Sequence, residues 1–382
     1  MKVSKDTLYI GVDDQEIRLF EGQFVVPQGM CYNSYLIKDE KTAVMDSVDG
    51  RFSKKWLDNI ESALNGESPR YLIVTHMEPD HSGSIGAFVE KYPRATIVGN
   101  AKTFALIDAF FDGLKYDKLV VTGGDELSLG THELRFLLAP MVHWPEVMPV
   151  YDAESRTLFS ADAFGKFGVY DADKDDWACE ARRYYFGIVG KYGAQVASLL
   201  TKVAALDIGT VCPLHGPVLS KDLSYYIGLY DMWSKYLPEK SGVTIAYCSV
   251  YGNTEKAALY LAKLLEAGGK EVDVFDLTVC DMAEAVEGAF ENSALVLCST
   301  TYNADVFPKM KEFLNWLTER NYQSRTVAFI ENGSWAPMAK KVMQGMLFSC
   351  KDLTFIEESC TIKSGYKPVN ATEVERIAKR LS

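Results

Sequence analysis

One short stretch constrains the fold of this chain more than any other: residues 70–84, which read RYLIVTHMEPDHSGS. Its apolar part, residues 71–74, is typical of a buried strand, and the Ser and Gly that follow predict a loop. Four polar side chains therefore stand where a strand emerges from the core: His76, Glu78, Asp80 and His81. They can converge on a metal ion, or they can form a solvated turn, and the rest of the chain has to decide between these two interpretations.

The remaining histidines favour the metal interpretation. Besides the two in this stretch, two further histidines and an aspartate directly follow apolar strands: His143 in LLAPMVHWPEVMP, His215 in VCPLHGP and Asp162 in TLFSADAFG. Taken singly, each has an ordinary explanation, as a hydrogen-bonded structural histidine or a turn-capping carboxylate. Taken together, four of five histidines in matching positions indicate ligands. The fifth, His132, is expected to be an exposed hairpin residue and not a ligand.

Composition excludes several classes of function. The chain has 382 residues, 48% hydrophobic and 24% charged, as expected for two globular domains. Its net charge of −12, with no cluster of Lys and Arg, argues against a nucleic-acid partner. Neither a signal peptide nor a run of roughly 18 apolar residues is found, so we expect a cytoplasmic protein without a membrane partner. The eight cysteines contain no C-x-x-C pair and are expected to be reduced and mostly buried.

The order of predicted elements indicates two α/β domains. In residues 1–240, strands and helices are mixed; the segments 17–26 and 33–47 are expected to form paired strands, and 53–64 an amphipathic helix. The Pro, Gly and charged residues of YLPEKSG, at 236–242, mark the boundary. From residue 243 to 382, strands alternate regularly with helices, which predicts a parallel doubly wound sheet.

Three loops of the second half predict a ligand site. The loop after VTIAY places a glycine, hydroxyls and N–H groups at a helix N-terminus, which favours phosphate, although an ordinary capped turn is the alternative. It is neither a G-x-G-x-x-G motif nor a P-loop. The loops after ALVLC and TVAFI reach the same crevice and bring aromatic side chains that suit an isoalloxazine ring, unless Trp335 only fills the core. The candidate residues are Ser249, Tyr251, Gly252, Asn253, Thr254, Thr300, Thr301, Tyr302, Asn303, Ala304, Asn332, Gly333, Ser334, Trp335 and Ala336.

The first half resembles the metallo-β-lactamase superfamily, in which H-x-H-x-D-H opens a two-metal site. The resemblance covers Asp46 in AVMDS, the motif of residues 76–81, and then the later two histidines and aspartate in order. One position departs from the pattern, because Glu78 stands where the hydrolases carry a second histidine. An additional carboxylate favours iron or manganese over zinc.

With Glu78 and the three loops, the whole chain resembles the flavodiiron proteins. This resemblance implies a metallo-β-lactamase-like αββα sandwich over residues 1–240, followed by a flavodoxin-like FMN domain over 243–382. It also implies a ligand set: His76, Glu78 and His143 for one iron, Asp80, His81 and His215 for the other, Asp162 bridging the two, and Asp46 orienting the cluster through hydrogen bonds.

The resemblance further implies reduction of dioxygen to water or of nitric oxide to nitrous oxide, with electrons that enter at FMN; it leaves open which gas is the substrate. An external donor such as a rubredoxin is expected, and a head-to-tail homodimer, or a dimer of dimers, would bring the flavin of one chain to the irons of another. A zinc hydrolase with an accessory flavodoxin domain is the first rival, and Glu78 argues against it. An electron carrier with a docking scaffold is the second, and it leaves the ligand set unexplained.

Overall fold

The computed structural model describes residues 1–172 and 176–382. The chain divides into two compact units, Met1–Asp231 and Met232–Ser382. The domain boundary that the sequence predicts, at residues 236–242, lies a few residues inside the second unit. None of the helices in the described ranges has the length and apolarity that crossing a bilayer requires.

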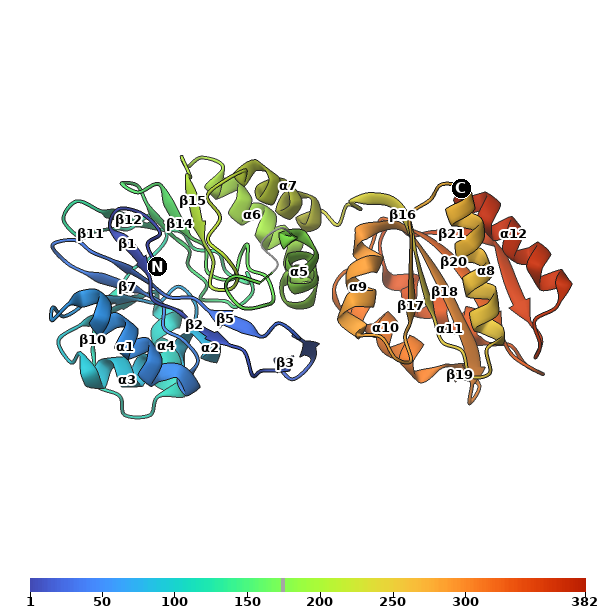
Figure 1. The fold of residues 1–382 in the computed structure, drawn as a ribbon, viewed down its shortest axis with the longest axis horizontal. Helices are drawn as coiled ribbons and strands as arrows, with labels where there is room; N and C mark the ends of the chain where they lie inside the picture. Colours follow the sequence, from blue (N-terminus) through green and yellow to red (C-terminus); the bar gives the residue numbers. More distant parts are fainter. Residues whose placement is uncertain (173–175) are drawn as a thin grey trace. The chain divides into compact units, whose positions relative to one another are not determined.

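Unit 1 is built on two sheets that face each other across one core (Figure 1). The first has the order β1-β6-β7-β8-β9-β10, with β7 to β10 parallel; these strands are β1 (Thr7–Tyr9), β6 (Tyr35–Ile37), β7 (Ala43–Met45), β8 (Tyr71–Ile73), β9 (Thr96–Gly99) and β10 (Asp117–Val120). The second has the order β11-β12-β13-β14-β15, antiparallel except for the last pair: β11 (Glu126–Ser128), β12 (Glu133–Phe136), β13 (Val150–Asp152), β14 (Thr157–Phe159) and β15 (Thr210–Cys212). Side chains from both sheets, such as Ile73 and Phe136, form the shared core.

Two small ribbons lie outside these sheets. The expected pairing of residues 17–26 with 33–47 is wrong, because each segment folds back on itself. The first forms the hairpin β3 (Leu19–Phe20) with β4 (Phe24–Val25), and the second forms the β6–β7 hairpin. The other ribbon pairs β2 (Val12–Asp14) with β5 (Met30–Tyr32).

The helices of unit 1 pack outside the sheets (Figure 1). In α1 (Ser53–Leu64), Trp56, Ile60 and Leu64 recur every four residues and are buried, and this helix has the bounds that the sequence predicts. The other helical segments are η1 (Gly50–Phe52), α2 (Pro79–Ser82), α3 (Ile85–Lys91), α4 (Ala101–Phe110), α5 (Trp177–Tyr184), a π-helix at Tyr185–Val189, η3 (Gly190–Tyr192), α6 (Gly193–Val203) and α7 (Leu223–Ser234).

Unit 2 is a parallel doubly wound sheet, as predicted, with the order β17-β16-β18-β20-β21. Its strands are β16 (Lys240–Tyr247), β17 (Val272–Asp276), β18 (Asn292–Tyr302), β20 (Thr326–Asn332) and β21 (Thr354–Ile362), and the short β19 (Asp305–Val306) pairs with the end of β18. Helices α8 (Asn253–Ala267) and α12 (Pro368–Leu381) cover one face; α9 (Met282–Glu291), α10 (Pro308–Glu319) and α11 (Ala339–Met346) pack elsewhere on the sheet, with η4 (Leu347–Ser349) after α11 (Figure 1). The strand order reverses between β16 and β18, which is where such sheets bind ligands.

Candidate metal centre and cofactor pocket

The candidate metal ligands gather at one end of the unit 1 sandwich, because each lies beyond the carboxyl end of a strand. His76 follows β8, His143 lies in the loop between β12 and β13, Asp162 follows β14 and His215 follows β15; Glu78, Asp80 and His81 lie at the start of α2 or within it. The loop that the sequence predicts there is in fact this short helix, since Pro79 at its first turn fixes a helical backbone angle.

A first group of side chains surrounds the point where β8 and the β12–β13 loop meet. The Nε2 atoms of His76 and His143 lie 3.3 and 2.9 Å from Oε2 of Glu78. Both Nε2 atoms also lie 3.3 Å from Oδ2 of Asp162. Donor atoms from these four residues all lie within 4.8 Å of one another, which is close enough for one cation to bind them together.

A second group adjoins the first and consists of Asp80, His81 and His215. The Nε2 atoms of both histidines lie 3.3 Å from Oδ2 of Asp80. Asp162 extends its other oxygen, Oδ1, to this group, at 3.3 Å from His81 and 4.0 Å from His215. One carboxylate therefore faces both groups, with one oxygen toward each.

The chemistry of these residues fits a two-metal centre. Asp80 and Asp162 have both carboxylate oxygens buried, and these oxygens accept no hydrogen bond of normal geometry from the described residues. Burying ionised oxygens without hydrogen bonds of normal geometry is costly unless a cation compensates them. A donor set of imidazoles and several carboxylates favours iron or manganese. The side chains of the two groups thus fit a pair of iron or manganese ions.

Electrostatics in the cluster keeps Glu78 and Asp162 ionised. Burial alone would raise the pKa values of Glu78 and Asp162, but the imidazoles of His76 and His143 outweigh burial and hold both values below their usual range. Conversely, burial opposes a charge on His143, yet Asp162 and Glu78 raise its pKa to about 9. Glu78 and Asp162 are therefore in the form that binds cations, and a metal ion has to displace a proton from His143.

Asp46 fixes the backbone at the end of β8. Its carboxylate accepts hydrogen bonds from the backbone N–H and the hydroxyl of Thr75, both at 2.6 Å, and from the backbone N–H of His76 at 3.2 Å. Burial raises the pKa of Asp46 to about 6, although these hydrogen bonds oppose the rise. Asp46 therefore holds the backbone that carries His76.

The structure adds partners to the histidines that the sequence analysis missed. Nδ1 of His76 lies 2.8 Å from Oε1 of Glu146, and Nδ1 of His215 donates to the backbone carbonyl of Cys31 at 2.7 Å. The only sequence signal for the role of Glu146 was its position three residues after the candidate ligand His143. The carbonyl of Cys31 leaves no trace in a sequence, because every residue has one.

Glu21, at the turn of the β3–β4 hairpin, is a further residue that the sequence analysis missed. The residue as a whole is exposed, but its carboxyl group is partly withdrawn from water beside Glu78 and His143. This partial burial and the charge of Glu78 raise the pKa of Glu21 to about 7, while His143 opposes the rise. An acid that titrates near neutrality therefore borders the first group.

The expectation that His132 is exposed is wrong, because this residue is buried. Its Nδ1 lies 2.8 Å from Oδ2 of Asp152, and its Nε2 lies 3.7 Å from Asp6. The hydrogen bond to Asp152 raises the pKa of His132, although burial opposes the rise. It lies at the end of the strands opposite to the other four histidines and belongs to neither group of candidate ligands.

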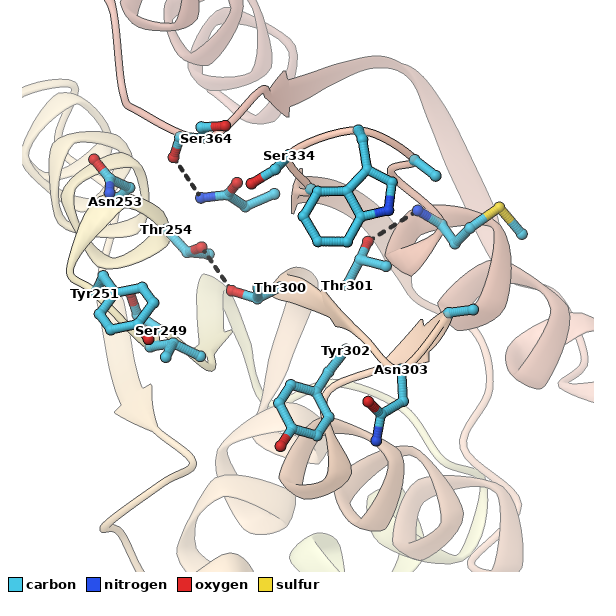
Figure 2. Close-up of a pocket in the computed structure, with 17 residues that line it drawn as sticks. Ser249, Tyr251, Asn253, Thr254, Thr300, Thr301, Tyr302, Asn303, Ser334 and Ser364 are labelled. Atoms are coloured by element: carbon cyan, nitrogen blue, oxygen red, sulfur yellow. Dashed lines mark hydrogen bonds between the residues drawn. The ribbon is translucent and has the colours of Figure 1, made fainter.

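A cavity of about 520 Å³ opens in unit 2 beyond the carboxyl ends of β16, β18 and β20 (Figure 2). All but one of the candidate cofactor residues line it; the exception, Gly252, stands directly before α8. The sequence analysis missed three lining residues, Val250, Met338 and Ser364. The cavity therefore lies where the strand order reverses.

Hydrogen bonds hold the first two loops in place beside the cavity. The hydroxyl of Ser249 accepts from the backbone N–H of Gly252 at 3.1 Å, and Thr254 and Thr300 join their hydroxyls at 3.2 Å (Figure 2). Gly252 has φ of +79°, which a glycine adopts without strain, and α8 begins there without a side-chain cap. The N-terminus of α8 thus presents backbone N–H groups that suit a phosphate.

Two large aromatic residues at the rim of the cavity are exposed. Trp335 is 92% and Tyr251 90% exposed in the single chain. The alternative interpretation of Trp335 as a core residue is therefore wrong. Both rings are available to cover a planar ligand.

Comparisons with known proteins assign the two halves to two families. A model described as "ODP family beta lactamase" matches residues 30–216, and the Flavodoxin model matches residues 245–351. A nitric oxide reductase of Moorella thermoacetica is 29% identical over 93% of this chain and 91% of its own length. An anaerobic nitric oxide reductase flavorubredoxin of Vibrio vulnificus is 28% identical over 87% of this chain and 70% of its own length. The crystal structure of the flavodiiron protein from Giardia intestinalis matches with a TM-score of 0.94 and 25% identity, covering 100% of this chain and 96% of that one.

Proposed function

Because this chain belongs to the flavodiiron protein family, we propose that it reduces dioxygen to water, or nitric oxide to nitrous oxide, at a diiron centre with electrons that arrive through FMN. The observation that carries the proposal is the position of Asp162, whose two oxygens face two groups of imidazoles and carboxylates. A carboxylate shared between two such groups is well placed to bridge a pair of metal ions.

The proposed ligand set assigns one iron to each group. His76, Glu78 and His143 would hold the first iron, Asp80, His81 and His215 the second, and Asp162 would bridge them. When bound, two ferrous ions supply electrons and open coordination positions to a diatomic gas. The protein contributes ionised carboxylates, backbone held by Asp46, and burial that keeps bulk water away from the ligands.

The cavity in unit 2 is proposed to bind FMN. Its volume suits one planar ring system with a side chain, and the N–H groups at the start of α8 offer a place for a single phosphate. The exposed rings of Tyr251 and Trp335 would lie against the isoalloxazine. No dinucleotide fingerprint accompanies the first loop, so FMN is preferred over FAD.

The donor, the assembly and the compartment are parts of the same proposal. An external protein such as a rubredoxin would supply electrons, and a head-to-tail homodimer, or a dimer of dimers, would pair the flavin of one chain with the irons of another. The exposed aromatic rim of the cavity supports a contact with a second protein surface. Free and mostly buried cysteines suit a reducing cytoplasm.

A zinc hydrolase fits these residues less well. Glu78 places a carboxylate where the related hydrolases carry an imidazole, and it accepts contacts from two histidines of the first group. This carboxylate favours iron over zinc. The structure also carries a formed cavity in unit 2, which a hydrolase would not use.

Metal and flavin analysis together with gas consumption tests the proposal. Protein prepared without oxygen should carry about two irons and one FMN per chain, and it should consume dioxygen or nitric oxide when supplied with reduced rubredoxin. The relative steady-state rates with the two gases identify the preferred substrate. Stoichiometric zinc, with hydrolysis of an ester, thioester or phosphodiester and no gas consumption, would overturn it.

A further inference from the structure

The two groups of ligands are matched in number and charge. Each offers two imidazoles and one carboxylate of its own, Glu78 in the first and Asp80 in the second, and Asp162 serves both. A difference between two metals bound there must therefore come from residues behind the ligands. The ring nitrogens that point away from the groups are where the two sides differ.

Behind the first group stands a buried carboxylate. Oε1 of Glu146 lies 2.8 Å from Nδ1 of His76, and both side chains are 0% exposed. The same oxygen accepts the backbone N–H of Met77 at 2.8 Å, and the backbone carbonyl of Glu146 accepts from Asn100 at 2.6 Å. Glu146 is therefore fixed from two directions and is aimed at the ring of His76.

Behind the second group, the described residues provide only a neutral acceptor. Nδ1 of His215 donates to the carbonyl of Cys31 at 2.7 Å. Nδ1 of His81 is buried and has no hydrogen-bond partner among the described residues. An imidazole that donates to a carboxylate is a more basic metal ligand than one that donates to a carbonyl or to nothing.

We propose that Glu146 is a positioning residue that makes the two irons unequal, by strengthening His76 as a ligand and so stabilising the ferric state of the iron in the first group. This inference rests on the proposed function. It predicts that the two irons accept electrons at separate potentials, and that the half-reduced, mixed-valence protein persists between them. The second group, without such a carboxylate, holds the iron that is reduced first.

The variant Glu146→Gln tests the inference, because glutamine keeps the shape and can keep both hydrogen bonds. Both N–H groups donate to one oxygen, Oε1, so the amide oxygen of glutamine can take that place while the charge is lost. The control is Asp152→Asn, which removes a carboxylate from an equal 2.8 Å bond to Nδ1 of His132, at the opposite end of the strands. Both variants are titrated with dithionite without oxygen, and the mixed-valence form is followed by electron paramagnetic resonance.

The wild type and Asp152→Asn should show a mixed-valence signal over the same range of potential. In Glu146→Gln the reduction potentials of the two irons should converge, so that this signal shrinks or disappears. Separately, the affinity of the metal-free protein for iron(II) should fall about 10- to 100-fold at one of the two sites. An unchanged signal and two unchanged affinities in Glu146→Gln would overturn the inference.

If Glu146→Gln does not fold, Glu146→Asp takes its place in the test. Aspartate keeps the negative charge but holds it at a greater distance from His76. The inference then predicts potentials that lie closer together than in the wild type, and an unchanged separation would overturn it. A wild-type protein that binds no iron pair would refute the proposed function itself, whereas an iron pair that ignores Glu146 refutes only this inference.

Discussion

His81 and His215 point their Nε2 atoms at one another across 3.0 Å. Since Nδ1 of His215 donates its proton to the carbonyl of Cys31, Nε2 of His215 carries the lone pair in the neutral ring. Two ring nitrogens that approach this closely, with Oδ2 of the buried Asp80 carboxylate 3.3 Å from each, converge on a position for one cation. Such a close approach of two imidazole nitrogens is typical of histidines that bind one metal ion.

Replacing one of these imidazoles should remove iron and spare the flavin. In His81→Ala the second group keeps only Asp80 and His215 beside the shared Asp162, so we expect iron content to fall to about half or less, and gas reduction to be lost. FMN content should stay at the wild-type level. Iron is measured by atomic absorption and flavin by absorbance after denaturation. The matched control is His132→Gln, at the histidine outside both groups, and an equal loss of iron in that variant would contradict the assignment.

Trp335 should contribute to flavin binding and little to folding. Its side chain is 92% exposed in the single chain, so Trp335→Ala removes no core packing. If the indole covers the isoalloxazine, its loss should weaken FMN binding by about 1 kcal/mol, or roughly fivefold in Kd, without a change in iron content. Fluorescence titration of flavin-free protein measures the Kd. Phe348→Ala, at a residue that is 85% exposed and does not line the cavity, should leave the Kd unchanged; a release of FAD on denaturation would count against the FMN assignment.

The pair of His132 and Asp152 should make the stability of unit 1 depend on pH. The folded state raises the pKa of His132, so the stabilisation is complete below the unfolded value of about 6.5 and is lost as pH rises through the folded value. Wild type should therefore exceed His132→Gln in unfolding free energy by about 1–3 kcal/mol near pH 6, and by less at pH 9. Denaturant unfolding of metal-free protein at several pH values measures this difference. A difference that stays constant with pH would show that His132 does not titrate in this range.

The sequence predicted which candidate ligands lie together better than it predicted the residues around them. His76, His143 and His215 could be placed together because each follows an apolar strand, and the ends of neighbouring strands meet at one edge. Glu146 acts through a contact with His76 that spans 70 residues of sequence, and such a contact has no local pattern. His132 was misjudged for the same reason, since its partner Asp152 arrives from another strand.

In the second unit the regular alternation of strands and helices predicted the sheet and the three loops. The cavity lining followed from the rule that ligands bind where the strand order reverses, between β16 and β18. The lining residue Ser364 was missed because it lies beyond β21, on a loop that carries no phosphate-binding pattern. Short hairpins such as β3–β4 could not be predicted from the sequence, because two-residue strands give no hydrophobic periodicity.

Subunit mixing tests the proposed dimer. One variant lacks iron through His81→Ala, and another lacks flavin through changes in the SVYGNT loop. After the subunits are dissociated and reassociated, a hybrid dimer keeps one intact iron pair opposite one intact flavin, so part of the gas reduction should return. Hybrid dimers that form, as native mass spectrometry would show, and that remain inactive would contradict the path of electrons between subunits.

The most direct test of the account follows the flavin while the gas reacts. Protein with its full complement of iron and FMN is reduced without oxygen and mixed rapidly with nitric oxide or dioxygen, and the reoxidation of the flavin is recorded beside the same experiment on His81→Ala. If electrons pass from the flavin through the metal centre to the gas, the wild-type flavin should reoxidise quickly with at least one gas, while the flavin of His81→Ala stays reduced for much longer. Equal rates of flavin reoxidation in the two proteins would show that the metal centre takes no part, and would contradict the account.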